Sequence, residues 1–583
     1  MNTSLAPIPY LLRIGVTGHR HPADDAAVAA AVGRLLQGIE QTLTASATSR
    51  GLSSERRTPL RWLIISPLAK GADRIVARAV LQKPGARLQV ITPLPLHEYR
   101  KDFGTAEDRS EFEDLLQRDL EPIELGQDSP ESAESYSDPE ARNEFYARVG
   151  RTVVDRCELL IAVWNGEAAA GRGGTGEIVQ YALEQNRVVL WIDSIAPDRD
   201  PVLLGPIRDK ERPNGPLPGS TVGPLPQSAK TLSRNFHQLS SYNRDAAFDE
   251  REYREVLRRN QKVLQRHAHN AGLSESALEC LQQRLLPHYA RADQLALHYQ
   301  RLYTWAAAAL YGLAAFAVSV AAIQVIFFPE HLWLISFEIA AMLAAVVLWK
   351  LSRRQGWHEK WLHDRHLAEQ IRTMLFTTLL GTPQNHAMEQ AQRMLSFYRG
   401  PDTWVREAHA QLLALAAECQ PHSIPFEQVK RFLIDGWILS QANWHAENAR
   451  RKGLAAHRAR GVGLGLFITT LIMATLHLFG IGHGEEGHRP ASHLAGGLIT
   501  CLAIILPAWG AAVHAISVLR DRERIAARSR RMAQVLRSIA ERAGSATTLD
   551  ELRKQAALAE EMMATENLEW WVTLSFRELE LPA

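Results

Sequence analysis

The stretch GRGGTGEIVQYAL, residues 171–183, combines residue types that suit an anion. Its glycines and threonine stand directly before a helical pattern. Glycine has no side chain and lets a backbone approach a ligand closely, and the free N–H groups and dipole at a helix N-terminus attract negative charge. Arg172 adds a cation. The stretch therefore predicts a phosphate-binding turn, although each glycine taken singly fits a tight turn equally well.

Glycine and polar residues also follow several apolar runs of the N-terminal third. If these runs are parallel strands, their carboxyl ends share one edge of a sheet, which is where such sheets bind ligands. Four loops that converge on one edge are harder to explain by turns alone. Trp164 could stack on a base at this edge. The predicted ligand-binding residues are Thr17, Gly18, His19, Arg20, Ser66, Lys70, Gly71, Asp73, Trp164, Asn165, Gly166, Arg172, Gly173, Gly174, Thr175, Gly176 and Glu177.

The elements that position these residues alternate between buried strands and amphipathic helices. Apolar runs such as LLRIGVTG, RLQVITPLP and RVVLWID are typical of strands with both faces covered. Between them lie helical patterns such as DDAAVAAAVGRLLQGIEQTL. This alternation predicts a Rossmann-like, doubly wound parallel α/β sheet over residues 1–195.

The motifs GVTGHR, GADRIVARAVL and LLIAVWNG…GGTGEIVQYA, in that order, resemble the SLOG superfamily. The resemblance covers about a third of the chain. That superfamily of Rossmann-like domains includes nucleotide sensors and the LOG-type phosphoribohydrolases. It implies a nucleotide-derived ligand, such as a cyclic nucleotide or an NAD-derived ADP-ribose species, and no other cofactor.

The same resemblance separates binding from catalysis. LOG-type enzymes carry a GGxGTxxE pattern whose glutamate acts on the ribosyl bond. Here Glu177 stands at the threonine position and Gln180 at the glutamate position. An amide cannot act as a carboxylate base, so we favour binding and assign no catalytic residue. The alternatives are a membrane-anchored phosphoribohydrolase-like enzyme with Glu177 as its acid, and a scaffold with a degenerate sensor.

Four apolar segments in the second half are long enough to span a membrane as helices. The first contains no charged residue, and the second contains one acid. Two buried helical hairpins of a soluble bundle are the alternative, but apolar runs of this length are hard to bury. The predicted spans are 306–328, 332–349, 461–479 and 494–513.

Lysine and arginine set the orientation of these spans. KLSRRQGWHEKW follows the second span, ARRKGLAAHRARG precedes the third and LRDRERIAARSRR follows the fourth, whereas the two short links hold a single arginine. The positive-inside rule then places both termini and the 350–460 region in the cytoplasm. We expect a multi-pass protein of the bacterial inner membrane.

The spans form an apparent repeat. RHLAEQIR at 365–372 resembles RRMAQVLR at 530–537, and Trp-rich amphipathic stretches close both halves. We interpret this as two copies of one module, two spans followed by a cytoplasmic helical bundle. The paired modules resemble SLATT domains, which accompany SLOG domains in bacterial conflict systems. The predicted regions are 1–195 (ligand-binding domain), 196–231 (proline-rich linker), 232–304 (cytoplasmic coupling helices), 305–455 (first module) and 456–583 (second module).

Together the two resemblances imply a membrane effector of anti-phage defence. A separate enzyme would make the nucleotide signal, and oligomerised spans would open or disrupt the membrane. A homo-oligomer is expected because four spans leave little room for a pore. The candidate gating residues are Glu338, whose alternative is an interfacial position near the end of its span, and Pro507, which weakens the helix locally. The series Gly461, Gly463 and Gly465 predicts close helix approach.

Composition limits other functions. The net charge of +2 over 583 residues argues against a chain-wide nucleic-acid surface. The four cysteines, Cys157, Cys280, Cys419 and Cys501, lie far apart, so we expect neither a disulfide framework nor a zinc site, and a reducing compartment fits. The histidines at 483, 488 and 493 lack a fixed ligand spacing, so no metal is predicted.

Overall fold

A computed structural model of the chain describes residues 5–48, 57–119, 122–125, 136, 138–169, 171–204, 227–381, 403–419, 424–481, 490–575 and 579–580. The chain forms two compact units. The first contains Met1–Asp245 and Arg406–Gln411, and the second contains Ala246–Val405 and Leu412–Ala583.

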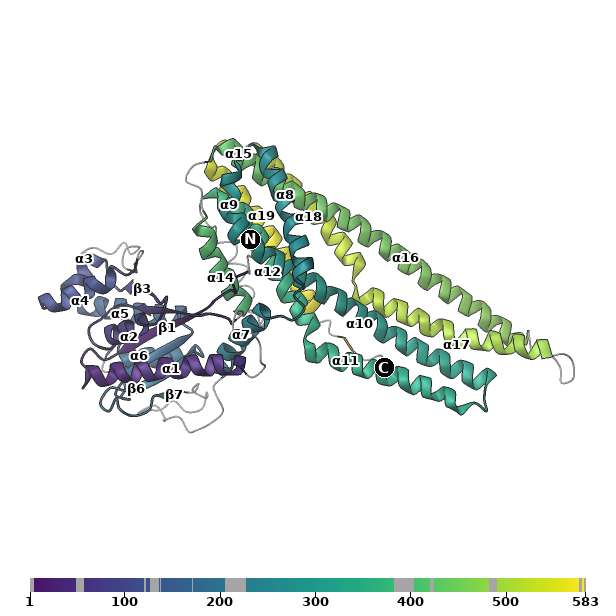
Figure 1. Ribbon diagram of the computed structural model, residues 1–583, viewed down its shortest axis with the longest axis horizontal. Coiled ribbons are helices and arrows are strands. Elements are labelled where there is room, and N and C mark those ends of the chain that lie inside the picture. The colour runs from purple at the N-terminus through teal and green to yellow at the C-terminus, as the bar shows by residue number, and fades with distance from the viewer. Residues whose placement is uncertain are drawn as a thin grey trace. The chain divides into compact units, whose positions relative to one another are not determined.

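The first unit is built on a seven-stranded sheet in the order β4-β3-β2-β1-β5-β6-β7. Figure 1 draws this sheet together with its helices. All neighbouring strands are parallel except β7, which runs antiparallel to β6. The predicted parallel α/β sheet is therefore confirmed. β1 lies between β2 and β5, so the strand order reverses there and creates the switch point at which such sheets bind ligands. The strands are β1 (Tyr10–Gly18), β2 (Leu60–Ser66), β3 (Arg87–Thr92), β4 (Ile123–Glu124), β5 (Leu159–Trp164), β6 (Val188–Asp193) and β7 (Val202–Leu204).

Helices cover both faces of this sheet, as two glycines of β1 demonstrate. A Cβ on Gly15 would lie 2.8 Å from Val153 of α5, and one on Gly18 would lie 2.4 Å from Ala72 of α2. Residues three apart in a strand point to opposite faces, so α2 and α5 lie on opposite faces. α1 packs beside α2, and α6 packs beside α5. The helices are α1 (Asp25–Thr48), α2 (Ala72–Leu81), α3 (Leu96–Tyr99), η2 (Arg100–Asp102), α4 (Ala106–Leu116), α5 (Pro139–Arg156), α6 (Thr175–Glu184) and α7 (Gln227–Asn243).

Strand β5, LLIAVW, is buried along its whole length because it has neighbours on both sides and helices on both faces. One core cluster joins its Leu160, Ala162 and Trp164 to the apolar faces of α5 and α6. The predicted linker, 196–231, begins differently from the expectation, since Val202–Leu204 adds the edge strand β7. Residues 205–226 of that linker lie outside the described residues.

Helix α14 (Thr403–Ala417) contributes its Arg406–Gln411 segment to the first unit. There the Glu407 carboxylate accepts hydrogen bonds from the Leu11 N–H, at 3.2 Å, and from the Arg13 guanidinium. The carboxylate of Glu158 also accepts from the Arg13 N–H. A segment far along the chain is thus held against β1 by charge-assisted bonds, a contact that no local sequence pattern announces.

The second unit is helical. Figure 1 shows its two hairpins of long helices, α10 with α11 and α16 with α17. Its elements are α8 (Glu250–Ala271), α9 (Glu275–Arg284), α10 (Leu286–Phe327), η3 (Leu332–Leu334), α11 (Ile335–Gln355), α12 (Trp357–Thr377), η4 (Thr378–Leu380), α15 (Phe426–Arg431), the π-helical turn η5 (Phe432–Ile438), α16 (Leu439–Leu478), α17 (Pro490–Leu519), α18 (Arg522–Gly544) and α19 (Leu549–Ser575). α10 packs on α11, α16 packs on α17, and α10 also packs on α17.

Four helical stretches of this unit are long and apolar enough to cross a membrane, and they cover the four predicted spans except for the last residue of the first and of the third, 328 and 479. Their apolar windows are mostly not buried inside the chain. Phe467 and Val347, for example, expose 67% and 63% of their surface. The soluble-bundle alternative required these side chains to be buried, and they are not. A lipid environment would cover such surfaces.

The long helices run past the predicted spans. The expected region boundary at 304/305 falls inside α10, and the boundary at 455/456 falls inside α16. Residues 365–372 lie on α12 and 530–537 on α18, the helices that directly follow the two hairpins. The two Trp-rich stretches that were expected to close both halves do not occupy equivalent positions. Residues 436–447 lie at the start of the long helix that leads into the second hairpin, whereas residues 569–575 lie at the end of α19.

Close helix approach occurs at a different glycine from those expected. Cβ atoms on Gly461, Gly463 and Gly465 would meet nothing within 4 Å. A Cβ on Gly497 of α17 would instead lie 3.0 Å from the Phe327 ring of α10. Among the glycines described in the predicted spans, Gly497 therefore has the tightest contact with another span helix.

Candidate functional site

His19 joins the loops that follow three strands. Its N–H donates to the Val163 carbonyl of β5 at 3.0 Å, and its carbonyl accepts from the Ala72 N–H at the start of α2 at 3.1 Å. Its Nε2 accepts from the Asn165 N–H at 3.2 Å. Because β1 and β5 flank the switch point, His19 ties the two loops that border it to the loop after β2. The structure thus brings these predicted residues together.

Gly71 is required at this junction. Its φ is +83°, and a Cβ there would lie 2.2 Å from the Arg20 carbonyl oxygen. Only glycine fits so close to another backbone in that conformation. The loop that contains Gly71 is held locally, since the buried Ser66 hydroxyl accepts from the Leu68 N–H at 2.9 Å. Ser66 is therefore a buried turn-former with its side chain already bonded within the loop.

Arg20 is an exposed cation at the same edge. Its guanidinium lies 5.8 Å from the centre of the Tyr146 ring. Within the described residues, no carboxylate lies at ion-pair distance from Arg20, although the charges of Asp73 and Asp102 act on it from farther away. An arginine that faces solvent without a paired carboxylate can give both its N–H edges to a phosphate.

Asp73 interacts electrostatically with Arg20 and is 5% exposed. Burial raises the pKa of its carboxyl to about 7, against the opposing effects of the Ala69 N–H and of the Arg20 and Arg74 charges. Burial also raises the pKa of the Tyr99 hydroxyl, and the charges of Asp73 and Asp102 add to that effect. Asp73 therefore changes its charge near neutral pH, close to the candidate anion site.

A cleft of about 790 Å³ opens beside the loops after β1 and β2. Arg20, His21, Lys70 and Arg78 line it. Lys70 pairs with Asp108 at 3.1 Å, and Arg78 pairs with Glu111 at 2.6 Å. Two of its cations are thus already neutralised, which leaves Arg20 as the arginine of the cleft that has no ion pair among the described residues.

The N-terminus of α6 was expected to offer free N–H groups to a phosphate, but a side chain of the protein already accepts one of the N–H groups before it. The carboxylate of Glu177 accepts the Gly173 N–H at 2.7 Å and pairs with Arg151 at 2.8 Å. Burial by itself would raise the pKa of Glu177, but the bonds from Gly173 and Arg151 outweigh it and lower the pKa overall. Glu177 is therefore an ionised acceptor at neutral pH, which disfavours it as the general acid of a hydrolase.

The glycines at the start of α6 approach the protein's own backbone. A Cβ on Gly173 would lie 2.9 Å from the Ala147 nitrogen of α5, and Cβ atoms on Gly174 and Gly176 would lie about as close to the loop that precedes the helix, at 3.0 and 2.8 Å. Thr175 begins the helix. Their close contacts are therefore with α5 and with that loop. Arg172 pairs with Glu144 of α5.

The remaining predicted residues divide into buried and accessible ones. The Trp164 side chain is 3% exposed and belongs to the core, so it does not offer the stacking surface that was expected of it. Its carbonyl accepts the indole N–H of Trp191 at 2.7 Å.

The other predicted residues are more accessible. Asn165 is half-buried and its amide donates to Glu167 at 2.8 Å. Gly166 adopts a φ of +84°, while Thr17 and Gly18 end β1, half-buried. Gln180 is exposed and bonds Glu184.

Several residues of this edge were missed from the sequence. Arg74 is 1% exposed, and its guanidinium donates to the Leu68 carbonyl and to Glu111. Its Nη2 has no hydrogen-bond partner in the described part of the chain. Asp102 pairs with Arg142. Arg74 is within the GADR stretch, which could have pointed to it, whereas Asp102 and Arg142 have no local pattern that marks them.

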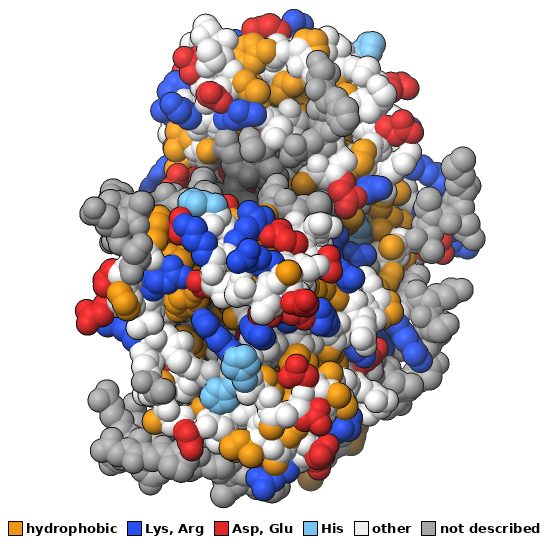
Figure 2. All heavy atoms as spheres, turned by 90° about the vertical axis from the view of Figure 1, so that its left-hand side faces the viewer, with side chains coloured by type: hydrophobic (Ala, Val, Ile, Leu, Met, Phe, Trp, Pro, Cys, Tyr) orange, Lys and Arg blue, Asp and Glu red, His pale blue; other side chains and the backbone are white. Residues whose placement is uncertain are grey.

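Charge is mixed on the face drawn in Figure 2, where basic and acidic side chains are interspersed.

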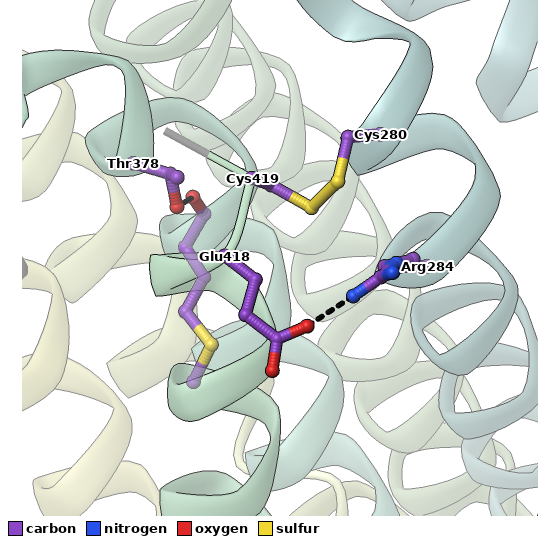
Figure 3. Close-up of a disulfide and its surroundings, with 6 residues drawn as sticks. Cys280, Arg284, Thr378, Glu418 and Cys419 are labelled. Atoms are coloured by element: carbon purple, nitrogen blue, oxygen red, sulfur yellow. Dashed lines mark hydrogen bonds and ion pairs between the residues drawn. A yellow bond between two sulfur atoms is a disulfide. The ribbon is translucent and has the colours of Figure 1, made fainter. Parts of the chain in front are cut away.

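The cysteine prediction is partly wrong. Cys280 of α9 and Cys419, just after α14, form a disulfide with a Cα–Cα separation of 5.4 Å (Figure 3). Beside it, Arg284 pairs with Glu418. The spacing of 139 residues gave no hint of the pair, because the two helices meet only in the folded bundle. Cys157 and Cys501 are free and buried.

The two gating candidates lie on span helices. Glu338 is in the first turn of α11, next to the short connection from α10, which fits its interfacial alternative better than a position deep in the span. Pro507 lies inside α17, as expected, where it removes one helical hydrogen bond. The histidines at 483 and 488 lie outside the described residues, and of the side chain at 493 nothing is described. No metal-binding group occurs among the residues that were described.

Comparison of the chain with protein-family models, with curated proteins and with solved structures finds no match in any of the three. The resemblance to the SLOG and SLATT families therefore rests on the motifs and the order of elements alone. Independently of that resemblance, the structure has a switch point lined by His19 and Arg20 in its first unit, and four helices long and apolar enough to cross a membrane in its second.

Proposed function

We propose that the α/β domain binds a nucleotide-derived, phosphate-bearing ligand at its switch point and that binding changes the permeability of a membrane spanned by the four apolar helices. The observation that carries the proposal is Arg20, which has no paired carboxylate among the described residues and stands at the junction that His19 builds. A phosphate would satisfy Arg20 and the nearby loops without displacing an existing ion pair.

The binding step is tested with the full chain in a neutral detergent. The probes are ADP-ribose and 3′,5′-cyclic AMP, with affinity measured by calorimetry. Arg20→Gln should weaken binding of the cognate probe by roughly tenfold or more, because a hydrogen bond to a charged group contributes about 1.5–3 kcal/mol. Arg61→Gln is the matched control, since Arg61 is also exposed but lies at the amino end of β2, on the opposite edge of the sheet.

The effector step is tested in liposomes loaded with a small dye. We expect release only when the cognate nucleotide is present, no release from the Arg20→Gln protein at matched concentration, and release from the Arg61→Gln protein as from the wild type. Tight nucleotide binding without any leak would reduce the spans to an anchor and refute the permeability part of the proposal. The spans would act as a homo-oligomer, which chemical cross-linking in the same liposomes measures.

The orientation belongs to the same proposal. Both termini would lie in the cytoplasm of a bacterial cell, where a signal-producing enzyme of anti-phage defence supplies the ligand. His331→Cys, in the exposed connection between α10 and α11, should react with an impermeant thiol reagent on intact cells. Gln355→Cys, at the exposed end of α11, should not. The reverse pattern would place the α/β domain outside, away from intracellular nucleotides.

A second candidate function is hydrolysis of the bound nucleotide. The buried Asp73, whose pKa is raised to about 7 by burial, is now better suited to acid–base chemistry than Glu177 is. Incubation of the full chain with ADP-ribose, cyclic AMP and nucleoside monophosphates, followed by chromatography for released base or ribose phosphate, decides between the two. Release that Asp73→Asn abolishes would favour the enzyme.

A further inference from the structure

The helical unit contains a cavity of about 860 Å³ that the proposed function does not use. Helices α10, α12, α16, α17, α18 and α19 line it. Four of its cations, Arg451, Lys452, Arg520 and Arg522, come from two places that flank the second hairpin: the polar part of α16 just before the third span, and the break between α17 and α18 just after the fourth.

The chain is arranged so that these cations stay together. Asp521 adopts a φ of +36°, which ends α17 and starts α18, so Arg520 and Arg522 stand on either side of the break. The Arg522 guanidinium donates to the Ala455 carbonyl of α16 at 3.3 Å, which fixes the start of α18 against α16. Lys452 is half-buried and interacts electrostatically with Arg520 and Arg522, which carry the same charge.

Nothing described neutralises the centre of this cluster. Arg451 has Glu447 at 3.6 Å, but within the described part of the chain Lys452, Arg520 and Arg522 have no carboxylate at ion-pair distance. Asp293 and Glu369, which line the same cavity from α10 and α12, are engaged elsewhere, since Asp293 pairs with Arg365, and Glu369 pairs with Arg365 and Arg372. Two acids of α19, Glu560 and Glu566, also line the cavity, but neither lies at ion-pair distance from these cations, and Glu566 interacts with Arg528, Arg365 and Arg372 instead. Partly buried like charges repel one another strongly, so an anion from outside the chain would stabilise the cluster.

An apolar groove continues from the cations. A second cavity of about 520 Å³ shares Arg451, Ala455, Ile516 and Arg522 with the first. Leu454, Val462 and Val513 line its other parts, and the last two belong to the third and fourth predicted spans. The combined site is thus cationic at one end and apolar at the other. It lies where the third predicted span begins and the fourth ends. A phospholipid with an anionic headgroup matches both ends, because its headgroup is anionic and its acyl chains are apolar. A soluble phosphate would bind the cations but would leave the apolar groove empty.

We propose that Lys452, Arg520 and Arg522 form a binding site for a phosphate oxyanion and that its occupant is the headgroup of an anionic phospholipid whose acyl chains lie along Val462 and Val513. Basic pockets between span helices are a general means of holding such headgroups. The site is separate from the switch point of the α/β domain and does not depend on the ligand proposed there.

The test uses the full chain in nanodiscs and in a neutral detergent. Binding of phosphatidylglycerol, phosphatidylcholine and inorganic phosphate is measured by native mass spectrometry and by thermal stabilisation. The first variant is Lys452→Gln/Arg520→Gln. The matched control, Arg530→Gln/Arg531→Gln, removes the same charge from exposed positions of α18 that do not line the cavity. Lys452→Arg/Arg520→Lys keeps the charge and shows whether side-chain shape alone matters.

We expect phosphatidylglycerol to bind the wild type and the control alike, and to bind the Lys452→Gln/Arg520→Gln protein roughly tenfold or more weakly, since each cation near a membrane surface adds a factor of about five. The charge-keeping variant should bind within a few-fold of the wild type. Selective binding of inorganic phosphate with no preference for phosphatidylglycerol over phosphatidylcholine would keep the oxyanion site and refute the lipid. Equal binding of every probe to both Gln variants would overturn the site altogether.

Discussion

The carboxylate of Glu177 accepts a hydrogen bond from the backbone N–H of Gly173, at 2.7 Å, across the first turn of α6. The helix N-terminus that looked ready for a phosphate therefore already holds an anion of its own, which Arg151 also binds. A ligand that reaches this turn must compete with Glu177, whereas one that binds Arg20 does not. The bond between Glu177 and Gly173 therefore makes Glu177 the residue to change when the glycine-rich stretch is tested.

Replacement of Glu177 by glutamine removes the resident charge and keeps an acceptor for the Gly173 N–H. We expect Glu177→Gln to strengthen binding of the cognate nucleotide several-fold, because a like charge near the phosphates is lost. Calorimetry of the full chain measures the change, with Glu184→Gln at the far end of α6 as the control. Weaker binding would instead mean that the Glu177 carboxylate itself contacts the ligand.

Asp73 predicts a pH dependence of stability. Burial raises the pKa of its carboxyl from the ordinary 3.8 to about 7. The folded protein therefore holds this proton more tightly than the unfolded chain does. The resulting stabilisation is complete below about pH 4 and is lost as the pH rises through 7, by about 1.4 kcal/mol for each pH unit between the two pKa values.

Asp73→Asn mimics the protonated carboxyl at every pH and provides the measurement. The variant should melt at the temperature of the wild type near pH 4 and at a higher temperature at pH 8, in the same detergent. Other titrating groups cancel in this difference because both proteins contain them. A gap between the two melting temperatures that does not grow with pH would show that Asp73 is ionised in the folded protein throughout.

Gly497 marks a close contact between two span helices, α17 and α10. Gly497→Leu forces a side chain against Phe327 and Ile326, whose atoms lie 3.0 and 3.2 Å from the added Cβ position. We expect a loss of about 1–3 kcal/mol of stability, as is usual for overpacking, measured as a lower melting temperature in detergent. Gly465→Leu, at an exposed position with nothing within 4 Å, should melt within a degree or two of the wild type. Equal melting of both variants would contradict the described contact between α10 and α17.

The Cys280–Cys419 pair tests the proposed orientation. Cytoplasmic thiols are kept reduced, so the pair should be free thiols in growing cells if these helices face the cytoplasm, and should join after purification in air. Alkylation of whole cells with N-ethylmaleimide, which crosses membranes, followed by reduction and mass analysis, counts the trapped thiols. A disulfide already present in the cells would place this region outside the cytoplasm and reverse the orientation, whereas Cys501→Ser should leave the pattern of the pair unchanged.

A large part of the architecture could be predicted because its signals are local. Strands such as LLIAVW are apolar along their whole length, and the spans are apolar for longer than a buried helix needs, so neither pattern depends on a distant residue. The convergence of the loops after β1, β2 and β5 followed from the parallel order, since all such strands end at one edge. The prediction that Trp164 stacks at that edge failed for a related reason: its side chain points into the core, and which face a strand's last residue takes depends on the sheet's register.

By itself, the sequence determined that this chain has a parallel α/β domain, four apolar spans and a set of loops that meet at one sheet edge. Tertiary structure alone decided that Glu177 fills the start of α6, that Asp73 is buried enough to titrate near neutrality, and that Gly497 is where two spans touch. It alone placed Lys452 beside Arg520 and Cys280 beside Cys419. The physical reason is range. Periodicity and apolarity are properties of neighbours along the chain, whereas the charge state of a carboxyl, a helix crossing or a cation cluster depends on groups that only packing brings together.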